Sequence, residues 1–263
     1  GTIRIETDGS CVGQVNGLAV MSAGPLTFGF PARITASAGA GSRGIVNIER
    51  ESQLSGRIHT KGSHILGGLL RQLLPTSHPL VFTISLAFEQ SYGGVDGDSA
   101  SGAETCCVLS ALTGIPLRQD LAMTGAIDQF GHIQPIGGAT EKVEGFFDAC
   151  SDMGLTGTQG VILPRANRRN LMLREEVVAA CAEGRFHIYC VEHISEALEL
   201  FTGVPCGTLD EDGNYPEGSL LGRAMERAAG YWRRVSGRAI PPELDPEPDE
   251  APKEATQGAP EEA

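Results

Sequence analysis

"GDSASGAETCCVLSALTG", residues 97–114, places a serine among acidic and small residues, directly ahead of an apolar run. The run has the length and the closing glycine of a buried helix, which we expect to begin near Ser99 or Ser101 and to end at Gly114. Ser101 and Glu104 have the spacing of a capping box. Ser99 is then either a polar residue at the start of this helix or a nucleophile presented there.

Strands and helices on both sides of this stretch predict a mixed sheet. The N-terminal strands are short and separated by glycine and proline, whereas strands and helices alternate in the C-terminal half. We expect strands at 2–7, 13–22, 29–38, 44–51, 80–88, 160–164 and 186–191, and a hairpin that turns at 128–131. We expect helices at 63–74, 99–112, 140–152, 168–184 and 193–203. This order predicts an α+β fold of roughly 200 residues.

The chain changes character after residue 206. We divide it into a main domain (1–206), a helical extension (207–240) and an acidic tail (241–263). An amphipathic helix is predicted over 219–238; it either packs back on the domain or contacts a partner, and we expect packing back. The tail holds eight acidic residues and one lysine and almost no large apolar side chains, so we expect disorder there.

Composition excludes several classes of protein. The net charge of −13 argues against a nucleic-acid surface. No apolar stretch is long enough to span a bilayer, so we expect no membrane contact and a cytoplasmic location. The seven cysteines follow no metal-ligand or disulfide spacing, and we expect them to be buried in a reducing compartment with no metal bound. No GxxxxGK[ST] sequence is present, so we expect no ATP site and no other cofactor in this chain.

A serine nucleophile needs a base, and one lysine is a candidate. Only three of the twenty basic residues are lysines, namely Lys61, Lys142 and Lys253. Lysine can be deprotonated near neutrality, whereas arginine cannot. Lys142 lies at the start of the predicted helix 140–152 beside apolar Val143 and Phe146, which could desolvate its amine if the neighbouring glutamates point elsewhere. Spacing alone does not pair it with Ser99, because Ser99 alone also fits a helix N-cap and Lys142 alone also fits a solvated helix position.

Longer motifs carry a family resemblance. "GDSAS", followed by "GAETCCVLSALTGIPLRQDLAMTGAIDQFGHIQPIGGATEKVEGFF", resembles the proteolytic domain of Lon protease, in the archaeal-type (LonB) branch and its bacterial LonB-like relatives. The resemblance includes "VGQVNGLAV", "IERESQLSGRIHTKGSHILGGLL" and "GVILPRAN" and covers residues 12–203. It implies the mixed-sheet fold of the ribosomal protein S5 domain 2-like class.

The resemblance implies a catalytic Ser–Lys dyad. Ser99 matches the nucleophile and Lys142 the general base, 43 residues apart. Thr124 matches a threonine that hydrogen-bonds near the lysine amine. Asp96 matches an acidic residue of the archaeal-type branch, for which we expect an orienting or regulatory role that includes pairing with the lysine in a resting state.

Other roles follow from the residues themselves. A helix that begins near Ser99 offers backbone N–H groups to an oxyanion, and Asp98 and Ala100 are the candidate donors. His59 is the alternative base among the six histidines. Lys61 is expected to be structural or to lie at a subunit contact.

The resemblance implies a serine endopeptidase (EC 3.4.21 class) that degrades unfolded or damaged proteins in protein quality control. It also implies a ring of six subunits and an ATPase-type module outside this chain, so we expect the chain to be a fragment of a larger enzyme. The alternatives are a non-catalytic scaffold of the RadA type and a different Ser–Lys amidase. A scaffold need not keep both Ser99 and Lys142, whereas this chain has both, so the protease is the favoured hypothesis.

Overall fold

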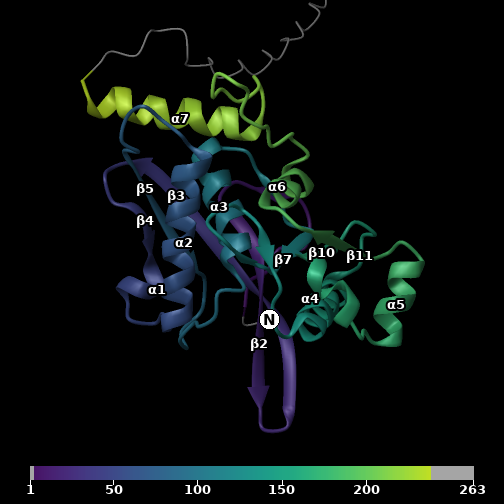
Figure 1. Cartoon of the computed structure of the whole chain (residues 1–263). Coiled ribbons are helices and arrows are strands. Elements are labelled where there is room, and N and C mark those ends of the chain that lie inside the picture. The colour runs from purple at the N-terminus through teal and green to yellow at the C-terminus, as the bar shows by residue number, and fades with distance from the viewer. Residues whose placement is uncertain (1–2, 238–263) are drawn as a thin grey trace, which may run out of the picture.

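The computed structural model describes residues 3–237, and a seven-stranded mixed sheet forms its centre (Figure 1). The strand order is β11 (His187–Val191), β10 (Gly160–Pro164), β7 (Leu121–Met123), β2 (Gln14–Ala23), β3 (Leu26–Ala40), β5 (Phe82–Phe88) and β4 (Gly44–Asn47). The pairs β2–β3 and β3–β5 are antiparallel and the other four are parallel. The predicted mixed sheet is therefore confirmed.

The helices cover both faces of this sheet. They are α1 (Ile48–Glu51), α2 (Arg57–Leu73), α3 (Ser101–Thr113), α4 (Ala139–Met153), α5 (Glu175–Ala182), α6 (Ile194–Thr202) and α7 (Leu220–Val235), with a 3-10 helix, η1, at Arg165–Asn170. Side chains alternate along β10: Ile162 joins the apolar cluster with α2, α3, α6 and α7, whereas Val161 and Leu163 join the cluster with α4 and α5. Helices α3 and α4 therefore lie on opposite faces of the sheet.

Helix α3 is the centre of the larger cluster. Its side chains are buried around the whole circumference, as expected of a helix without a polar face. It ends at Gly114 in the left-handed conformation, as predicted, with φ of 73°. The prediction of a capping box is wrong. The N-cap is Ala100, and the Glu104 side chain is fully buried and makes no hydrogen bond to the N-cap backbone.

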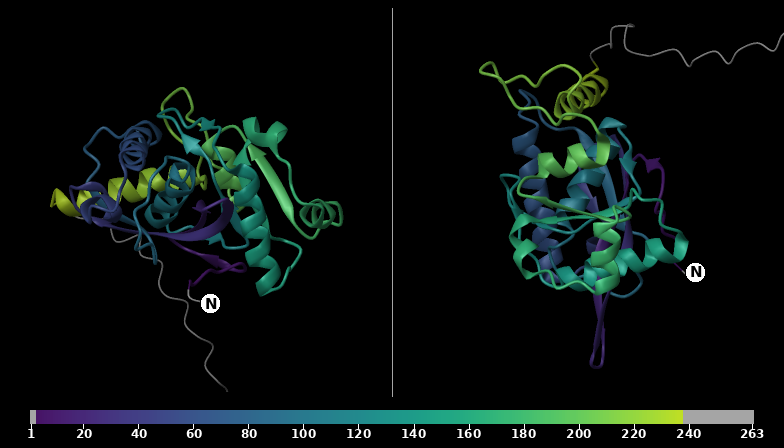
Figure 2. Two further views of the ribbon diagram at one scale, coloured as in Figure 1. Left: turned by 90° about the horizontal axis from the view of Figure 1, so that it is seen from below. Right: turned by 90° about the vertical axis from the view of Figure 1, so that its right-hand side faces the viewer.

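Short elements connect this framework. The predicted hairpin is confirmed as β8 (Ala126–Ile127) paired with β9 (Ile133–Gln134). A two-residue pair joins β1 (Ser10–Cys11) to β6 (Leu117–Arg118). The long β2–β3 hairpin projects beyond the rest of the body (Figures 1 and 2).

Four predicted elements differ from the structure. No strand forms at residues 3–7, and the stretch 44–51 divides into β4 and α1. Helix α2 begins at Arg57, earlier than predicted. The helix predicted over 168–184 is interrupted between η1 and α5. In this interval Leu171 and Leu173 pack against the apolar cluster that contains α4 and α5.

The amphipathic helix predicted near the C-terminus is confirmed as α7, and it packs back on the domain. Leu220, Leu221 and Ala224 belong to the same apolar cluster as α3, and the Trp232 ring stacks on His78. The predicted tail (241–263) lies outside the described residues. Within the described part, no helix is both long and apolar enough to cross a membrane. All seven cysteines are free.

Candidate active site

Ser99 and Lys142 meet at the carboxyl end of β7. The Lys142 amine donates to Ser99 Oγ at 2.7 Å and to Thr124 Oγ1 at 3.0 Å. Ser99 lies just before α3 and Lys142 lies in the first turn of α4, so the two side chains come from opposite faces of the sheet. They can meet because β7 ends at Met123, one residue before Thr124.

Burial makes the Lys142 amine a feasible base. Only 3% of the residue is exposed, and this loss of water lowers the pKa of Lys142 from 10.5 to about 8, against an opposing effect of Asp98. The positive end of the α4 dipole acts in the same direction as burial. Glu144 points away as required, since its carboxylate accepts from the Arg174 backbone at 2.7 Å.

Two glycines fix the position of α4 against the sheet. A Cβ on Gly29 of β3 would lie 2.0 Å from the Glu141 carbonyl oxygen and 2.7 Å from Lys142 Cα. A Cβ on Gly145 would lie 2.0 Å from the Gly29 carbonyl oxygen. Backbone therefore touches backbone here, and the contact determines how far Lys142 reaches toward Ser99.

The loop that carries Ser99 is held by hydrogen bonds that leave its hydroxyl available. The Gly125 N–H donates to the Ser99 carbonyl at 2.7 Å, and Thr124 Oγ1 donates to the same oxygen at 3.2 Å. Ser101 Oγ donates to the Asp98 carbonyl at 2.8 Å and accepts from Ile127 N–H. Ser101 therefore has the structural role, and Ser99 uses its hydroxyl to contact Lys142.

Asp96 lies at the N-terminus of α2, away from Lys142. Its Oδ1 accepts from the N–H groups of Gly97 at 2.8 Å and of Ile58 and His59 at 3.1 Å each. These bonds, first that from Gly97, lower the pKa of Asp96. The expected resting-state pair with the lysine is absent from this structure, and Asp98 is the acid whose charge acts on Lys142.

The candidate oxyanion donors are free. Among residues 3–237, no hydrogen bond engages the backbone N–H of Asp98 or of Ala100, the N-cap of α3. Both therefore remain available to an oxyanion beside Ser99, at the positive end of the helix.

The other candidates lie elsewhere. His59 is 1% exposed and directs its ring toward Asn47 and Glu104, so it is not the base that contacts Ser99. Lys61 is exposed on α2. In the described part of the chain, no cluster of acidic, histidine or cysteine side chains could hold a metal ion.

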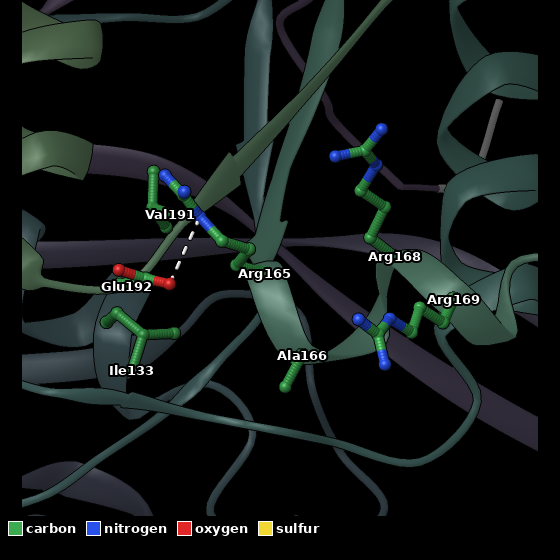
Figure 3. Close-up of a pocket in the computed structure, with 7 residues that line it drawn as sticks. All are labelled: Ile133, Arg165, Ala166, Arg168, Arg169, Val191 and Glu192. Atoms are coloured by element: carbon green, nitrogen blue, oxygen red, sulfur yellow. Dashed lines mark ion pairs between the residues drawn. The ribbon is translucent and has the colours of Figure 1, made fainter.

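A separate surface cleft does not include the dyad. It is lined by Ile133, Arg165, Ala166, Arg168, Arg169, Val191 and Glu192 (Figure 3). Arg165 pairs with Glu192 at 3.3 Å across this cleft. Neither Ser99 nor Lys142 lines this cleft, so the candidate catalytic dyad and the cleft are separate sites.

The sequence patterns do not predict three features of the structure around the dyad. The Gly29–Gly145 contact joins residues far apart in the chain, and no local pattern marks either glycine. The role of Ser101 depends on Ile127, which is equally non-local. Glu104 was predicted as a capping residue, although an acid inside the run "GAETCCVL" also fits a buried position because its neighbours are small or apolar.

Comparisons with known proteins point to one family. Residues 91–202 match the Lon protease (S16) C-terminal proteolytic domain. The chain is 47% identical over 200 residues to a "Putative Lon protease homolog" of Escherichia coli (strain K12), covering 75% of this chain and 34% of that protein. It is 43% identical over 240 residues to a protein of the same description from Haemophilus influenzae, covering 90% and 39%. It is 32% identical over 211 residues to an archaeal Lon protease of Thermococcus kodakarensis, covering 74% and 28%.

The chain therefore spans less than half of the length of these relatives. The family match includes Ser99, Thr124 and Lys142. The similarity to the bacterial and archaeal relatives extends well beyond the matched segment. The chain belongs to the Lon protease family and carries its S16 C-terminal proteolytic domain.

Proposed function

We propose that the chain is the proteolytic part of a Lon-like serine endopeptidase with a Ser99–Lys142 dyad. The observation that carries the proposal is the 2.7 Å hydrogen bond between a buried lysine amine and a serine hydroxyl in front of a helix N-terminus. Burial lowers the pKa of Lys142 to about 8, so a useful fraction of the amine is neutral at physiological pH. We include the ribosomal protein S5 domain 2-like fold class in this proposal.

The mechanism follows from the geometry. Neutral Lys142 removes the proton from Ser99 Oγ as the oxygen attacks a peptide carbonyl. The N–H groups of Asp98 and Ala100 stabilise the oxyanion, and the Lys142 ammonium then protonates the leaving amine. A water molecule, deprotonated by Lys142, then attacks the acyl-enzyme in the same way, which releases the product acid and restores the Ser99 hydroxyl. Thr124 Oγ1 keeps the amine directed at Ser99 through its 3.0 Å bond.

Substrates and assembly belong to the same proposal. We expect unfolded or damaged polypeptides as substrates and a homo-hexameric ring as the working assembly. The chain covers only 34–39% of the two bacterial relatives described above, and we assign any use of ATP to an ATPase-type module outside this chain. The free cysteines fit a cytoplasmic location.

Covalent labelling tests the function directly. The chain is incubated with a serine-reactive covalent probe, and the modified residue is mapped by mass spectrometry, alongside cleavage of casein. We expect the label on Ser99, and we expect prior labelling to stop casein cleavage. Labelling at another serine, or no labelling of the folded chain while casein remains intact, would favour the scaffold alternative.

The pH dependence identifies the base. Because the free amine is the active form, kcat/KM for a fluorogenic peptide should rise about tenfold per pH unit between pH 6 and 7, and the rise should flatten as pH approaches 8. The measurement is a kcat/KM profile at constant ionic strength. A rising limb centred near 6.5 would instead indicate a histidine base.

A further inference from the structure

A buried polar cluster lies behind the Ser99 loop and takes no part in the mechanism above. It consists of Asn47, Glu49, His59 and Glu104, none of them more than 4% exposed. They come from the N-terminal ends of three helices, α1, α2 and α3. Burying two carboxyls and an imidazole in an otherwise apolar core is costly unless the groups are un-ionised or paired.

Glu104 is the most unusual member. It is 0% exposed, and neither of its carboxyl oxygens has a hydrogen-bond partner among the described residues. Burial, with a smaller effect from Glu49, raises the pKa of Glu104 to about 8. Glu104 is therefore un-ionised at neutral pH. Its Oε1 lies 3.7 Å from Nε2 of the His59 ring.

His59 connects this carboxyl to the Ser99 loop. Its backbone N–H donates to Asp96 at 3.1 Å, and the backbone of Gly97 acts on its ring as an acceptor does, in the direction that raises the pKa of His59. Burial, the larger effect, nevertheless lowers the pKa of His59, so the imidazole is neutral. The loop residues Asp96 and Gly97 lie only three and two positions before Ser99.

One tautomer of His59 satisfies all of its partners. Asn47 Oδ1 accepts from the Arg50 N–H, so Asn47 Nδ2 is the atom that donates to His59 Nε2, at 3.1 Å. Nε2 is therefore an acceptor, and in the neutral ring Nδ1 carries the proton, which the Gly97 backbone favours. A proton on Nε2 would face the Asn47 amide hydrogens and break this arrangement.

We propose that His59 is a positioning residue for the nucleophile loop, and that Glu104 acts through His59 so that the loop holds Ser99 against Lys142 only while Glu104 is un-ionised. The proposal rests on the proposed proteolytic function. When Glu104 ionises, it releases one proton to solvent and leaves an unpartnered carboxylate beside His59. The carboxylate favours a proton on Nε2, which competes with the Asn47 bond and loosens the contact with Gly97.

The charged and titratable neighbours of the pair are few. Glu49 faces Glu104 from α1, Cys107 lies on the same helix α3, and Asp96 faces His59 from the loop. Glu49 differs from Glu104 because its Oε1 accepts from the Phe88 N–H at 2.8 Å. Glu49→Gln is therefore a matched control that changes a buried carboxyl without removing the group that faces His59.

The first test compares kcat at pH 9.5 with kcat at pH 8 for a fluorogenic peptide. In the wild type and in Glu49→Gln we expect kcat to be lower at pH 9.5 than at pH 8. In Glu104→Gln, whose amide cannot ionise, the ratio of kcat at pH 9.5 to kcat at pH 8 should be about tenfold higher than in the wild type. His59→Asn keeps a donor in the place of Nδ1 but cannot reach Glu104, so it should also lose the alkaline fall. His59→Gln lacks the Nδ1 donor, and its kcat should be lower than that of His59→Asn at every pH.

The second test does not depend on proteolysis. Amide hydrogen exchange at residues 97–101, corrected for intrinsic rates, should accelerate above pH 8 in the wild type but not in Glu104→Gln. Profiles of Glu104→Gln and His59→Asn that superimpose on the wild type, with active enzyme, would overturn the inference and leave the function standing. A chain that cuts no peptide and is not labelled at Ser99, but shows Glu104-dependent loop exchange, would refute the function and support the coupling.

Discussion

Lys142→Arg and Ser99→Ala should each reduce casein and peptide cleavage by about 10⁴-fold, because a dyad fails when either member is lost. Arginine preserves the positive charge and much of the length of lysine. Its guanidinium does not deprotonate in proteins, so it cannot accept the Ser99 proton at any usable pH. The substitution therefore separates a role in proton transfer from a role as a fixed cation.

Two further variants complete this experiment. Lys142→Met retains the apolar stem, removes the amine and should be as inactive as Lys142→Arg. Lys61→Arg makes the same chemical change at an exposed position on α2 and should retain activity. The measurement is steady-state cleavage by each variant, with far-UV circular dichroism to verify folding.

Activity that survives Lys142→Arg would contradict the lysine-base mechanism. The base would then have to be another group, and the structure offers no histidine in hydrogen-bond contact with Ser99 Oγ among the described residues. A wild type that is inert on both substrates would point to a requirement for the ring or for the ATPase-type module, and labelling at Ser99 would distinguish that case from a scaffold.

Local sequence patterns predicted the elements well but not the pairing of the dyad. The apolar run after Ser99 and the glycines at 114 and 154 were enough to place α3 and α4. Ser99 and Lys142 approach from opposite faces of the sheet, so helical periodicity cannot bring them together. Only the resemblance over the longer motifs paired them.

Residues whose partners are distant in sequence were misassigned for a related reason. Ser101 has the sequence pattern of a helix cap, but its hydroxyl accepts from the backbone N–H of Ile127 on strand β8. Asp96 was expected near Lys142, but it caps α2, which begins nearly forty residues earlier. Both assignments depend on where α2 and β8 pack, and a single sequence does not contain that information in local form.

The Gly29–Gly145 contact leads to the second large effect. Gly29→Ala would place a methyl group 2.0 Å from the Glu141 carbonyl oxygen, and neither strand β3 nor helix α4 can yield by rotating a side chain. Helix α4 must therefore move away from the sheet and carry Lys142 with it. We expect the free energy of unfolding to fall by about 1–3 kcal/mol. We expect kcat to fall about 100-fold, because a shift of about 1 Å in a catalytic group has an effect of that size.

Gly39→Ala is the matched control for this variant. Gly39 lies on the same strand, and a Cβ there would meet no atom within 4 Å. It therefore introduces the same methyl group without moving α4, and both stability and kcat should stay close to those of the wild type. Chemical denaturation and peptide kinetics on both variants provide the comparison. A Gly29→Ala protein with near-normal kcat would show that the close approach does not position the base.

Positioning can be separated from general destabilisation by the pH profile of the same variant. If α4 moves away from β3, water reaches the Lys142 amine and the desolvation that lowers its pKa is partly lost. The rising limb of kcat/KM should then move from about 8 toward the usual lysine value of 10.5. A variant that is only less stable would keep the limb near 8 and lose activity in proportion to the unfolded fraction. An upward shift of the limb in Gly29→Ala, with none in Gly39→Ala, would therefore link a backbone contact on the sheet to the protonation state of the base.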